Sequence, residues 1–94
     1  MPDITVADVP ARSRYEIRVD GVVAGFATYR GEHGLRVMEH TEIDDAHEGQ
    51  GLGGRLAAGV LDDVRKRGMR VRLDCPFMRG YVARHPEYQD LVGD

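Results

Sequence analysis

The segment that most constrains this fold is the glycine-rich run Gly49 to Gly54, which stands directly before an amphipathic pattern. From about Gly51 to Arg67, apolar residues recur every fourth position, at Leu52, Leu56, Val60 and Val64. This spacing places them along one face of a helix, and Gly68 suits the C′ position that ends it. The sequence therefore predicts a helix that starts from a tight turn with unblocked backbone N–H groups.

Three antiparallel strands are predicted before this helix. Residues 13–19 alternate between apolar and polar, Asp20-Gly21 supplies a turn, and the apolar-rich residues 22–29 complete a hairpin. After a second break at residues 31–34, residues 35–43 fit a third strand, antiparallel to the second. A polar loop, residues 44–48, then leads to the glycine-rich run.

The region after the helix predicts a parallel strand and a second helical region. Residues 69–73 form a short strand, and because the preceding helix acts as a crossover, this strand lies parallel to the third one. Pro76 fits the first position of a helix running towards Arg84; His85-Pro86 interrupts it, and residues 87–92 form a last turn. We expect an α/β (α+β) fold, in which antiparallel strands lead into a βαβ unit, with residues 1–94 as a single domain.

Charge and composition exclude several classes of function. The 16 acidic and 13 basic side chains give a net charge of −3, without the basic segregation typical of a nucleic-acid or membrane-surface protein. The start, Met1-Pro2-Asp3-Ile4, lacks the blocks of a signal peptide, and no apolar run reaches the roughly 18 residues of a spanning helix. We expect a cytoplasmic protein that contacts neither nucleic acid nor membrane.

Cysteine and histidine usage gives no support for a disulfide or a metal site. Cys75 is the only cysteine, so an internal disulfide is excluded. The four histidines, His33, His40, His47 and His85, lack the spacing of a zinc ligand set. We expect no bound metal.

The glycine-rich run admits several interpretations, because open helix N-termini bind phosphate in many folds. Gly49-x-Gly51-x-x-Gly54 matches the dinucleotide fingerprint, and Asp74 follows 20 residues later, but five residues separate Ile43 from Gly49 and the preceding strands form hairpins. A triphosphate-binding loop would need Lys and then Ser or Thr where Arg55-Leu56 stand. The glycines would otherwise serve only a tight turn and close packing, at about 1 kcal/mol of helix propensity each.

The string Glu48-Gly49-Gln50-Gly51-Leu52-Gly53 resembles the coenzyme A signature of the GNAT acetyltransferase superfamily, Arg/Gln-x-x-Gly-x-Gly/Ala. The likeness extends over LRVMEHTEIDDAHEGQGLGGRL and VRLDCPFMRGYVARHPEYQDL, which look like the small GNAT-like branch with a Cys-Pro-aromatic element. One departure is Glu48, which replaces the Arg or Gln that opens the signature and puts a like charge near a phosphate. The other is size: Asp20-Gly21 leaves no room for the two helices that help form the acceptor pocket of larger members, so the acceptor site should be open.

This resemblance implies acetyl-CoA as the ligand and assigns its contacts. The pyrophosphate would lie on the backbone of the glycine turn, at Gln50, Gly51, Gly53, Gly54 and Arg55. The pantetheine arm would lie between the two parallel strands, against Thr41, Glu42 and Ile43 on one side and against residues 73–75 and Pro76 on the other.

Three side chains are candidates for the chemistry of acyl transfer. Cys75 stands before Pro76 at the start of a helix and is either an acyl-accepting nucleophile or a buried apolar residue. Tyr81 matches the tyrosine that many GNAT enzymes place beside the coenzyme sulfur as an acid, or it packs in the core. His40, with Glu42 on the same strand face, is either a base or a structural polar residue. Arg79 and Arg84 are weaker candidates for phosphate binding.

The predicted function is therefore that of an acetyl-CoA-dependent N-acetyltransferase. Acetyl would pass to a small-molecule or protein amine, directly or through Cys75. The alternative from another class is a non-enzymatic sensor or interaction module that binds CoA or acyl-CoA, and a dinucleotide-binding fragment is third. We expect a monomer or a weak homodimer.

Overall fold

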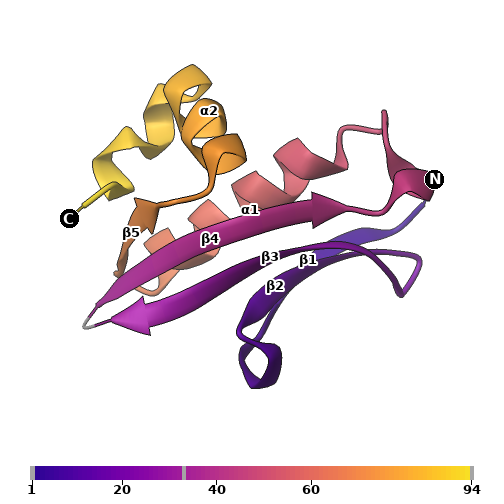
Figure 1. The fold of residues 1–94 in the computed structure, drawn as a ribbon, viewed down its shortest axis with the longest axis horizontal. Coiled ribbons are helices and arrows are strands. Elements are labelled where there is room, and N and C mark those ends of the chain that lie inside the picture. Colours follow the sequence, from indigo (N-terminus) through magenta and orange to yellow (C-terminus); the bar gives the residue numbers. More distant parts are fainter. Residues whose placement is uncertain (1, 33, 94) are drawn as a thin grey trace.

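A computed structural model describes residues 2–32 and 34–93 and shows one five-stranded sheet, in the order β1-β2-β3-β4-β5, with its helices (Figure 1). The strands are β1 (Ile4–Val9), β2 (Arg14–Val19), β3 (Val22–Glu32), β4 (Leu35–Ile43) and β5 (Arg70–Leu73). The helices are α1 (Leu52–Lys66) and α2 (Pro76–Arg84), and 3-10 turns are η1 (Pro10–Arg12), η2 (Asp45–His47) and η3 (Pro86–Leu91). Neighbouring strands are antiparallel except β4 and β5, which are parallel. The predicted α/β fold with its βαβ unit is confirmed.

The prediction of three strands before the helix was wrong: four strands precede α1, because β1 also joins the sheet. It pairs antiparallel with β2 along its whole length, from Ile4 opposite Val19 to Val9 opposite Arg14. Its apolar alternation is interrupted by Asp8, which is buried beside Arg36, so the strand pattern is too short to recognise locally. The connection between the first two strands is therefore η1, and not Asp20-Gly21 as we expected. It is equally too short for two helices.

The predicted hairpin and third strand are confirmed, and β3 is three residues longer than expected. Asp20 and Gly21 both have positive φ, 51° and 84°, as a tight hairpin turn between β2 and β3 requires. Strand β3 extends to Glu32 because it pairs with β4 as far as Leu35. The break expected at residues 31–34 contains residue 33, which lies outside the described residues.

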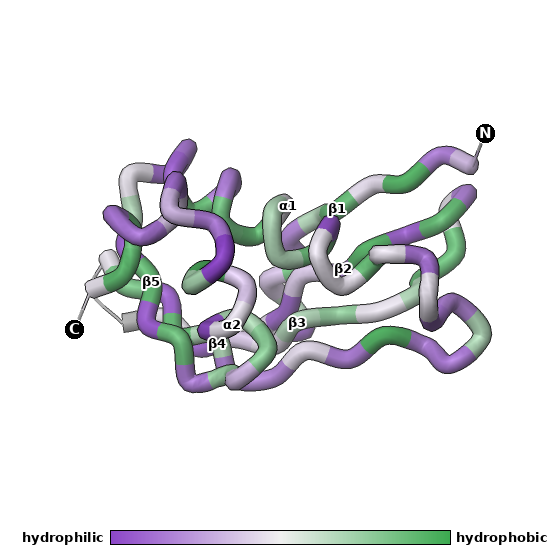
Figure 2. The backbone as a smooth tube through the Cα atoms, turned by 90° about the horizontal axis from the view of Figure 1, so that it is seen from above, coloured by the Kyte–Doolittle hydropathy of each residue, from purple (hydrophilic) through white to green (hydrophobic). Residues whose placement is uncertain are grey.

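Helix α1 covers one face of the sheet and contacts all five strands. The fourfold apolar stripe forms the core as predicted: Leu52, Leu56, Val60 and Val64 are buried against sheet residues such as Ile17. Gly59, which lies next to Val60 in α1, allows β1 to approach the helix closely, since a Cβ at this position would lie 2.7 Å from the Cβ of Val6. Figure 2 shows α1 beside β1, the strand whose approach this glycine allows.

The parallel strands β4 and β5 separate halfway along β4. Their pairing ends at Met38 opposite Leu73, where the carbonyl oxygen of Met38 accepts hydrogen bonds from the N–H groups of Asp74 (3.0 Å) and Cys75 (3.1 Å). On the other side of β4 the register with β3 shifts by one residue at Glu39. Within the described residues, β4 therefore continues to Ile43 without a β5 partner.

The C-terminal region closes the β5 edge of the sheet. Pro76 is the first residue of α2, as predicted, and η3 follows after His85. The chain then forms a parallel bridge from Val92 to Val71 of β5. In the described part of the chain, neither α-helix combines the length and apolarity that crossing a membrane requires.

Candidate functional site

The glycine turn leaves the start of α1 without a cap. Gly49 and Gly51 adopt left-handed conformations, with φ of 81° and 74°, and Gly51 is the N-cap residue of the helix. No side chain accepts a hydrogen bond from the first turn, and the first backbone bond is from Arg55 N–H to the Gly51 carbonyl at 3.3 Å. The N–H groups at the preceding positions, Leu52, Gly53 and Gly54, lie before that bond and need a partner from outside the helix.

Glycine is required at these positions of the turn for two different physical reasons. A Cβ at Gly49 or Gly51 would meet nothing within 4 Å, so these two glycines are required by positive φ. A Cβ at Gly53 would lie 2.9 Å from a ring carbon of Phe77, so this glycine makes room for α2. Close packing thus explains Gly53, whereas Gly49 and Gly51 shape the open end of the helix.

A first hollow of about 360 Å³ lies between the end of β4, η2 and the glycine turn. Its lining includes four of the residues assigned to coenzyme binding, namely Ile43, Gly51, Gly53 and Gly54. It also includes two that the sequence analysis did not place in the site, His47 and Phe77. Phe77 is the aromatic residue of the Cys-Pro-aromatic element, and this sequence signal could have identified it. In the structure 41% of it is exposed. His47 stands directly before the glycine signature.

A second hollow of about 490 Å³ follows on between α1 and α2 and shares Gly51, Gly54 and Phe77 with the first. It brings Arg55 together with Arg84 and Tyr81. The Tyr81 ring stacks on His85, with centroids 3.9 Å apart, and burial raises the pKa of Tyr81 above its usual value. Tyr81 therefore lies on the α1 side of α2, where a Cβ at Gly54 would be 3.6 Å from its ring.

Cys75 lies where β4 and β5 separate. It is the N-cap residue of α2, as expected, and only 3% of it is exposed. Its Sγ donates a hydrogen bond to Oγ1 of Thr41 at 3.4 Å, so the two predicted walls of the pantetheine site are in contact here. Hydrogen bonds from Arg72 hold the pKa of the neighbouring Asp74 below its usual value, and this pairing offsets the negative charge next to the thiol.

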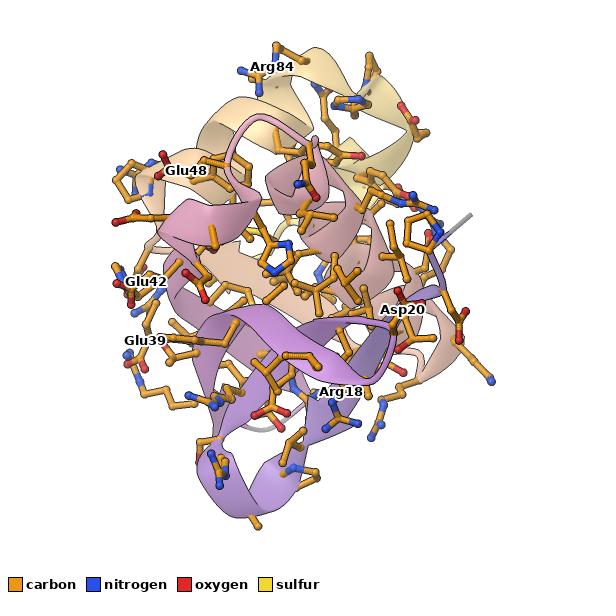
Figure 3. The ribbon with its side chains drawn as sticks, turned by 90° about the vertical axis from the view of Figure 1, so that its right-hand side faces the viewer. Arg18, Asp20, Glu39, Glu42, Glu48 and Arg84 are labelled. Carbon is orange, nitrogen blue, oxygen red and sulfur yellow. The ribbon has the colours of Figure 1, made fainter. Side chains whose placement is uncertain are left out.

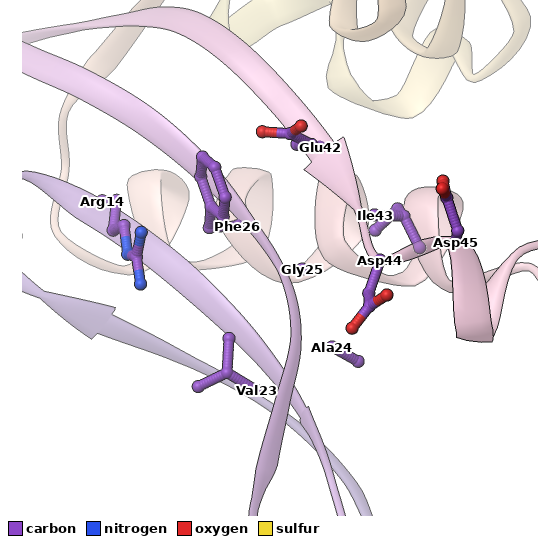
Figure 4. A pocket seen from close by; sticks show the side chains of 9 residues that line it. All are labelled: Arg14, Val23, Ala24, Gly25, Phe26, Glu42, Ile43, Asp44 and Asp45. Atoms are coloured by element: carbon purple, nitrogen blue, oxygen red, sulfur yellow. The ribbon is translucent and has the colours of Figure 1, made fainter.

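His40 and Glu42 lie on the sheet face opposite α1, in register with Thr28 and Phe26 of β3. Their side chains are 63% and 61% exposed, and His40 Nε2 is 3.6 Å from a Glu42 carboxylate oxygen. Glu42 also lines a third hollow, of about 440 Å³, on this open face. Figure 4 shows that the same hollow carries the carboxylates of Asp44 and Asp45.

The remaining predicted residues are not among those that line these three hollows. Gln50 is exposed in the glycine turn, and Pro76 begins α2. Arg79 donates to the carbonyl oxygens of Leu73 and Asp74, at 3.1 and 3.2 Å, so it supports the end of β5. No three histidine, cysteine or carboxylate side chains among residues 2–32 and 34–93 are grouped as metal ligands. His33, one of the histidines considered above, lies outside that part.

Comparison with known proteins gives these features a context. Residues 14–91 match the family described as GCN5-related N-acetyl-transferase. The mouse protein NATD1 is 29% identical over 82 residues, which are 85% of this chain and 74% of the mouse protein. Human and chicken NATD1 are each 35% identical over 54 residues, 57% of this chain, so the match spans about half of their length, 48% and 49%.

A solved structure shows the same fold. A GCN5-like protein from Staphylococcus aureus, determined by NMR, superposes with a TM-score of 0.69 over 97% of this chain and 87% of its own, at 22% identity. The family match covers most of the chain, including the strands that separate, the glycine turn and α2. This protein therefore belongs to the GCN5-related N-acetyltransferase family.

Proposed function

We propose that this protein binds acetyl-CoA across the start of α1 and transfers the acetyl group to a primary amine. The observation that carries the proposal is the uncapped first turn of α1, with its left-handed Gly51, beside the point where β4 and β5 separate. Three successive N–H groups, together with the positive end of the helix dipole, suit the two charges of a pyrophosphate. Members of this family generally use acetyl-CoA, and the residues present fit its phosphates.

The hollow between α1 and α2 supports a place for the adenosine end of the coenzyme. Arg55 and Arg84 line it, and a guanidinium can pair with phosphate through two parallel hydrogen bonds. Phe77, exposed between the two hollows, offers an aromatic face on which a base can stack. The 3′-phosphoadenosine end would follow from the pyrophosphate along this groove.

The unpaired part of β4 supports a place for the pantetheine arm. Residues Thr41 to Ile43 extend beyond the end of β5, and an arm that contains two amides can add to such an edge like a strand. The thioester would then reach the contact between Cys75 and Thr41.

The open face of the sheet suits the entry of the amine. The hollow in Figure 4 carries Glu42, Asp44 and Asp45, whose charges attract an ammonium ion. Glu42, with His40 beside it, would take a proton from the amine. The amine nitrogen attacks the thioester carbonyl carbon, the C–N bond forms as the C–S bond breaks, and the leaving thiolate takes up a proton.

Direct transfer is favoured over a route through Cys75. The thiol is buried and already donates to Thr41, whereas a nucleophilic cysteine must become an accessible thiolate. Tyr81, whose phenol carries a proton at neutral pH, is the candidate acid for the leaving thiolate. Its position beside Gly54 means that this role requires the sulfur to approach from the α1 side.

Calorimetric titration with acetyl-CoA, CoA and NAD tests the binding step. We expect both forms of the coenzyme to bind and NAD not to bind. No detectable binding of CoA at millimolar concentration would overturn the proposal, and tighter binding of NAD would favour the dinucleotide interpretation.

Turnover with a panel of primary amines separates an enzyme from a sensor. Acetylated amine is expected for the enzyme, whereas coenzyme binding without any product would indicate the sensor. Intact-protein mass after incubation with acetyl-CoA tests the covalent route: an added acetyl group that is absent from Cys75→Ala, together with loss of turnover in that variant, would replace direct transfer by a route through the thiol.

A further inference from the structure

The family signature opens with Arg or Gln, but this chain has Glu48 at that position, so the pyrophosphate site lacks its usual side-chain donor. Glu48 is exposed and lines the first hollow together with the glycine turn. In the view of Figure 3, Glu48, Glu42 and Glu39 follow one another along the same side of the molecule. A phosphate at the turn would thus meet a carboxylate at the position where the signature has Arg or Gln.

His47, the residue before Glu48, lines the same hollow and is held in place by its backbone. It ends η2, and its N–H donates to the carbonyl oxygen of Asp44 at 2.8 Å. Asp44 in turn caps η2, because its carboxylate accepts from Ala46 N–H at 3.2 Å. These bonds fix the backbone at His47, and its side chain lines the hollow together with Gly49, Gly51 and Gly53.

One nitrogen of the His47 ring is closed off. Nδ1 is buried and has no hydrogen-bond partner among the described residues. A proton on Nδ1 would be a buried N–H group without an acceptor, and leaving such a donor unsatisfied is unfavourable. Nε2 is the ring nitrogen left to meet a ligand, and the tautomer with its proton on Nε2 offers a hydrogen-bond donor there.

We propose that His47 is a positioning residue for the coenzyme, and that its Nε2–H donates to a pyrophosphate oxygen in place of the donor that Glu48 does not supply. This inference rests on the proposed function, since it assumes that the hollow takes a pyrophosphate. Glu48 is the charged side chain that lines the same hollow, and Asp44 and Asp45 of the same loop line the hollow on the open face of the sheet. Arg55 and Arg84 line the adjacent hollow. His47 is thus the polar side chain that offers an N–H group within the first hollow.

Two substitutions of His47 distinguish a hydrogen-bond donor from a space-filling ring. His47→Phe keeps a ring of similar shape without a donor, and His47→Gln keeps an N–H near the position of Nε2. CoA and dephospho-CoA are the probes, because both carry the pyrophosphate and only CoA carries the 3′-phosphate. Thermal unfolding of each variant confirms that it is folded at the temperature of the titration.

We expect His47→Phe to weaken both ligands by the same factor, about tenfold or more for a hydrogen bond to a charged group. His47→Gln should remain within about threefold of wild type for both ligands. Unchanged binding by His47→Phe would overturn the proposal, and so would an equal loss in His47→Gln, which would mark a packing role. A loss confined to CoA would move the contact to the 3′-phosphate and overturn the pyrophosphate assignment. If wild type binds neither ligand, the proposed function itself fails.

Discussion

The polar groups at the two ends of α1 differ in whether they have partners within the protein. At the C-terminal end, six side chains pair with one another under the helix and form what we call the closed network, in which the buried Nε of Arg36 has no partner among the described residues: Asp8, Tyr15, Tyr29, Arg36, Asp63 and Arg67. At the N-terminal end, the first turn has no side-chain cap and faces two hollows. Buried charges need partners within the protein, whereas open N–H groups at the surface are available to a ligand. The comparison separates the end of α1 that stabilises the fold from the end that we propose binds the coenzyme.

The closed network is built around Asp8 and Arg36. The Asp8 carboxylate accepts from the hydroxyl of Tyr29 and pairs with Arg36 at 3.3 Å and Arg67 at 3.2 Å. The Arg36 guanidinium also lies 4.1 Å from the centre of the Tyr29 ring and donates to the Tyr15 hydroxyl at 2.7 Å. Burial and the bond to Asp8 raise the pKa of Tyr29 to about 12. Removing one member leaves several others unpaired.

Disrupting the closed network at the C-terminal end of α1 should have the largest effect on stability. Arg36→Met removes the charge that faces Asp8 and Tyr15, and we expect the free energy of unfolding to fall by about 3 kcal/mol. Urea unfolding measures this loss. The matched control is Arg30→Met, which removes an exposed arginine paired with Glu39 and should change stability by less than about 1 kcal/mol. Equal effects of the two substitutions would contradict the distinction between buried and exposed pairs.

The next test compares two left-handed glycines at opposite ends of α1. Gly51 and Gly68 have φ of 74° and 69°, and a Cβ at either would meet nothing within 4 Å. Alanine at either position should therefore lower the free energy of unfolding by a similar amount, roughly 1–2 kcal/mol. Only Gly51→Ala should weaken CoA binding, by about tenfold or more, because relief of strain there moves the open N–H groups. Calorimetry that finds equal CoA affinity in the two variants would count against the proposed site.

The pH dependence of stability sharpens the account of the closed end. The pKa of Tyr29 is raised from 10.0 to about 12, first by burial and then by its bond to Asp8. The unfolded chain loses this proton near pH 10 and the folded chain near pH 12, so the stability contributed by Tyr29 is complete below pH 10 and is lost as the pH rises towards 12. Tyr29→Phe should cost about 1 kcal/mol at pH 7 and make this alkaline decline shallower, while Tyr88 and Tyr15, whose pKa values are also raised, keep their part of it. Urea titrations from pH 8 to 12 measure both, and an unchanged slope would rule out Tyr29 as its source.

The smallest expected effect concerns the charge at the open end. Glu48→Gln removes a negative charge beside the first turn of α1 and restores the side-chain type of the family signature. We expect CoA to bind about two- to fivefold more tightly at low salt, with a smaller gain at high salt. Glu39→Gln, on the same side of the molecule but paired with Arg30, is the control and should leave the affinity unchanged. Equal gains in both variants would indicate a general charge effect.

Most of the fold could be predicted because its signals are local. The stripe of Leu52, Leu56, Val60 and Val64 predicted α1, and Pro76 predicted the start of α2 to the residue. Strand β1 was missed because Asp8 breaks its alternation. Asp8 is stable in that position only because Arg36 and Arg67, distant in the sequence, are brought to it by the fold.

The candidate site was predictable in its backbone and less so in its side chains. Positive φ at Gly49 and Gly51 and the uncapped helix agree with the expected turn. His47 and Phe77 were not placed in the site, since their positions depend on how η2 and α2 pack against the turn. Tyr81 was predicted to lie beside the coenzyme sulfur as an acid. Whether its side chain faces the strands or α1, however, depends on how α2 packs against the rest of the fold.

The sequence by itself determined both α-helices, the four strands β2 to β5 and the glycines that the start of α1 requires, because periodicity and backbone conformation are properties of neighbouring residues. Only the tertiary structure decided where β4 and β5 separate. That point is set by the register shift at Glu39 and by Asp74 and Cys75 sharing the carbonyl oxygen of Met38. These are contacts between segments far apart in the chain, and no local pattern encodes them.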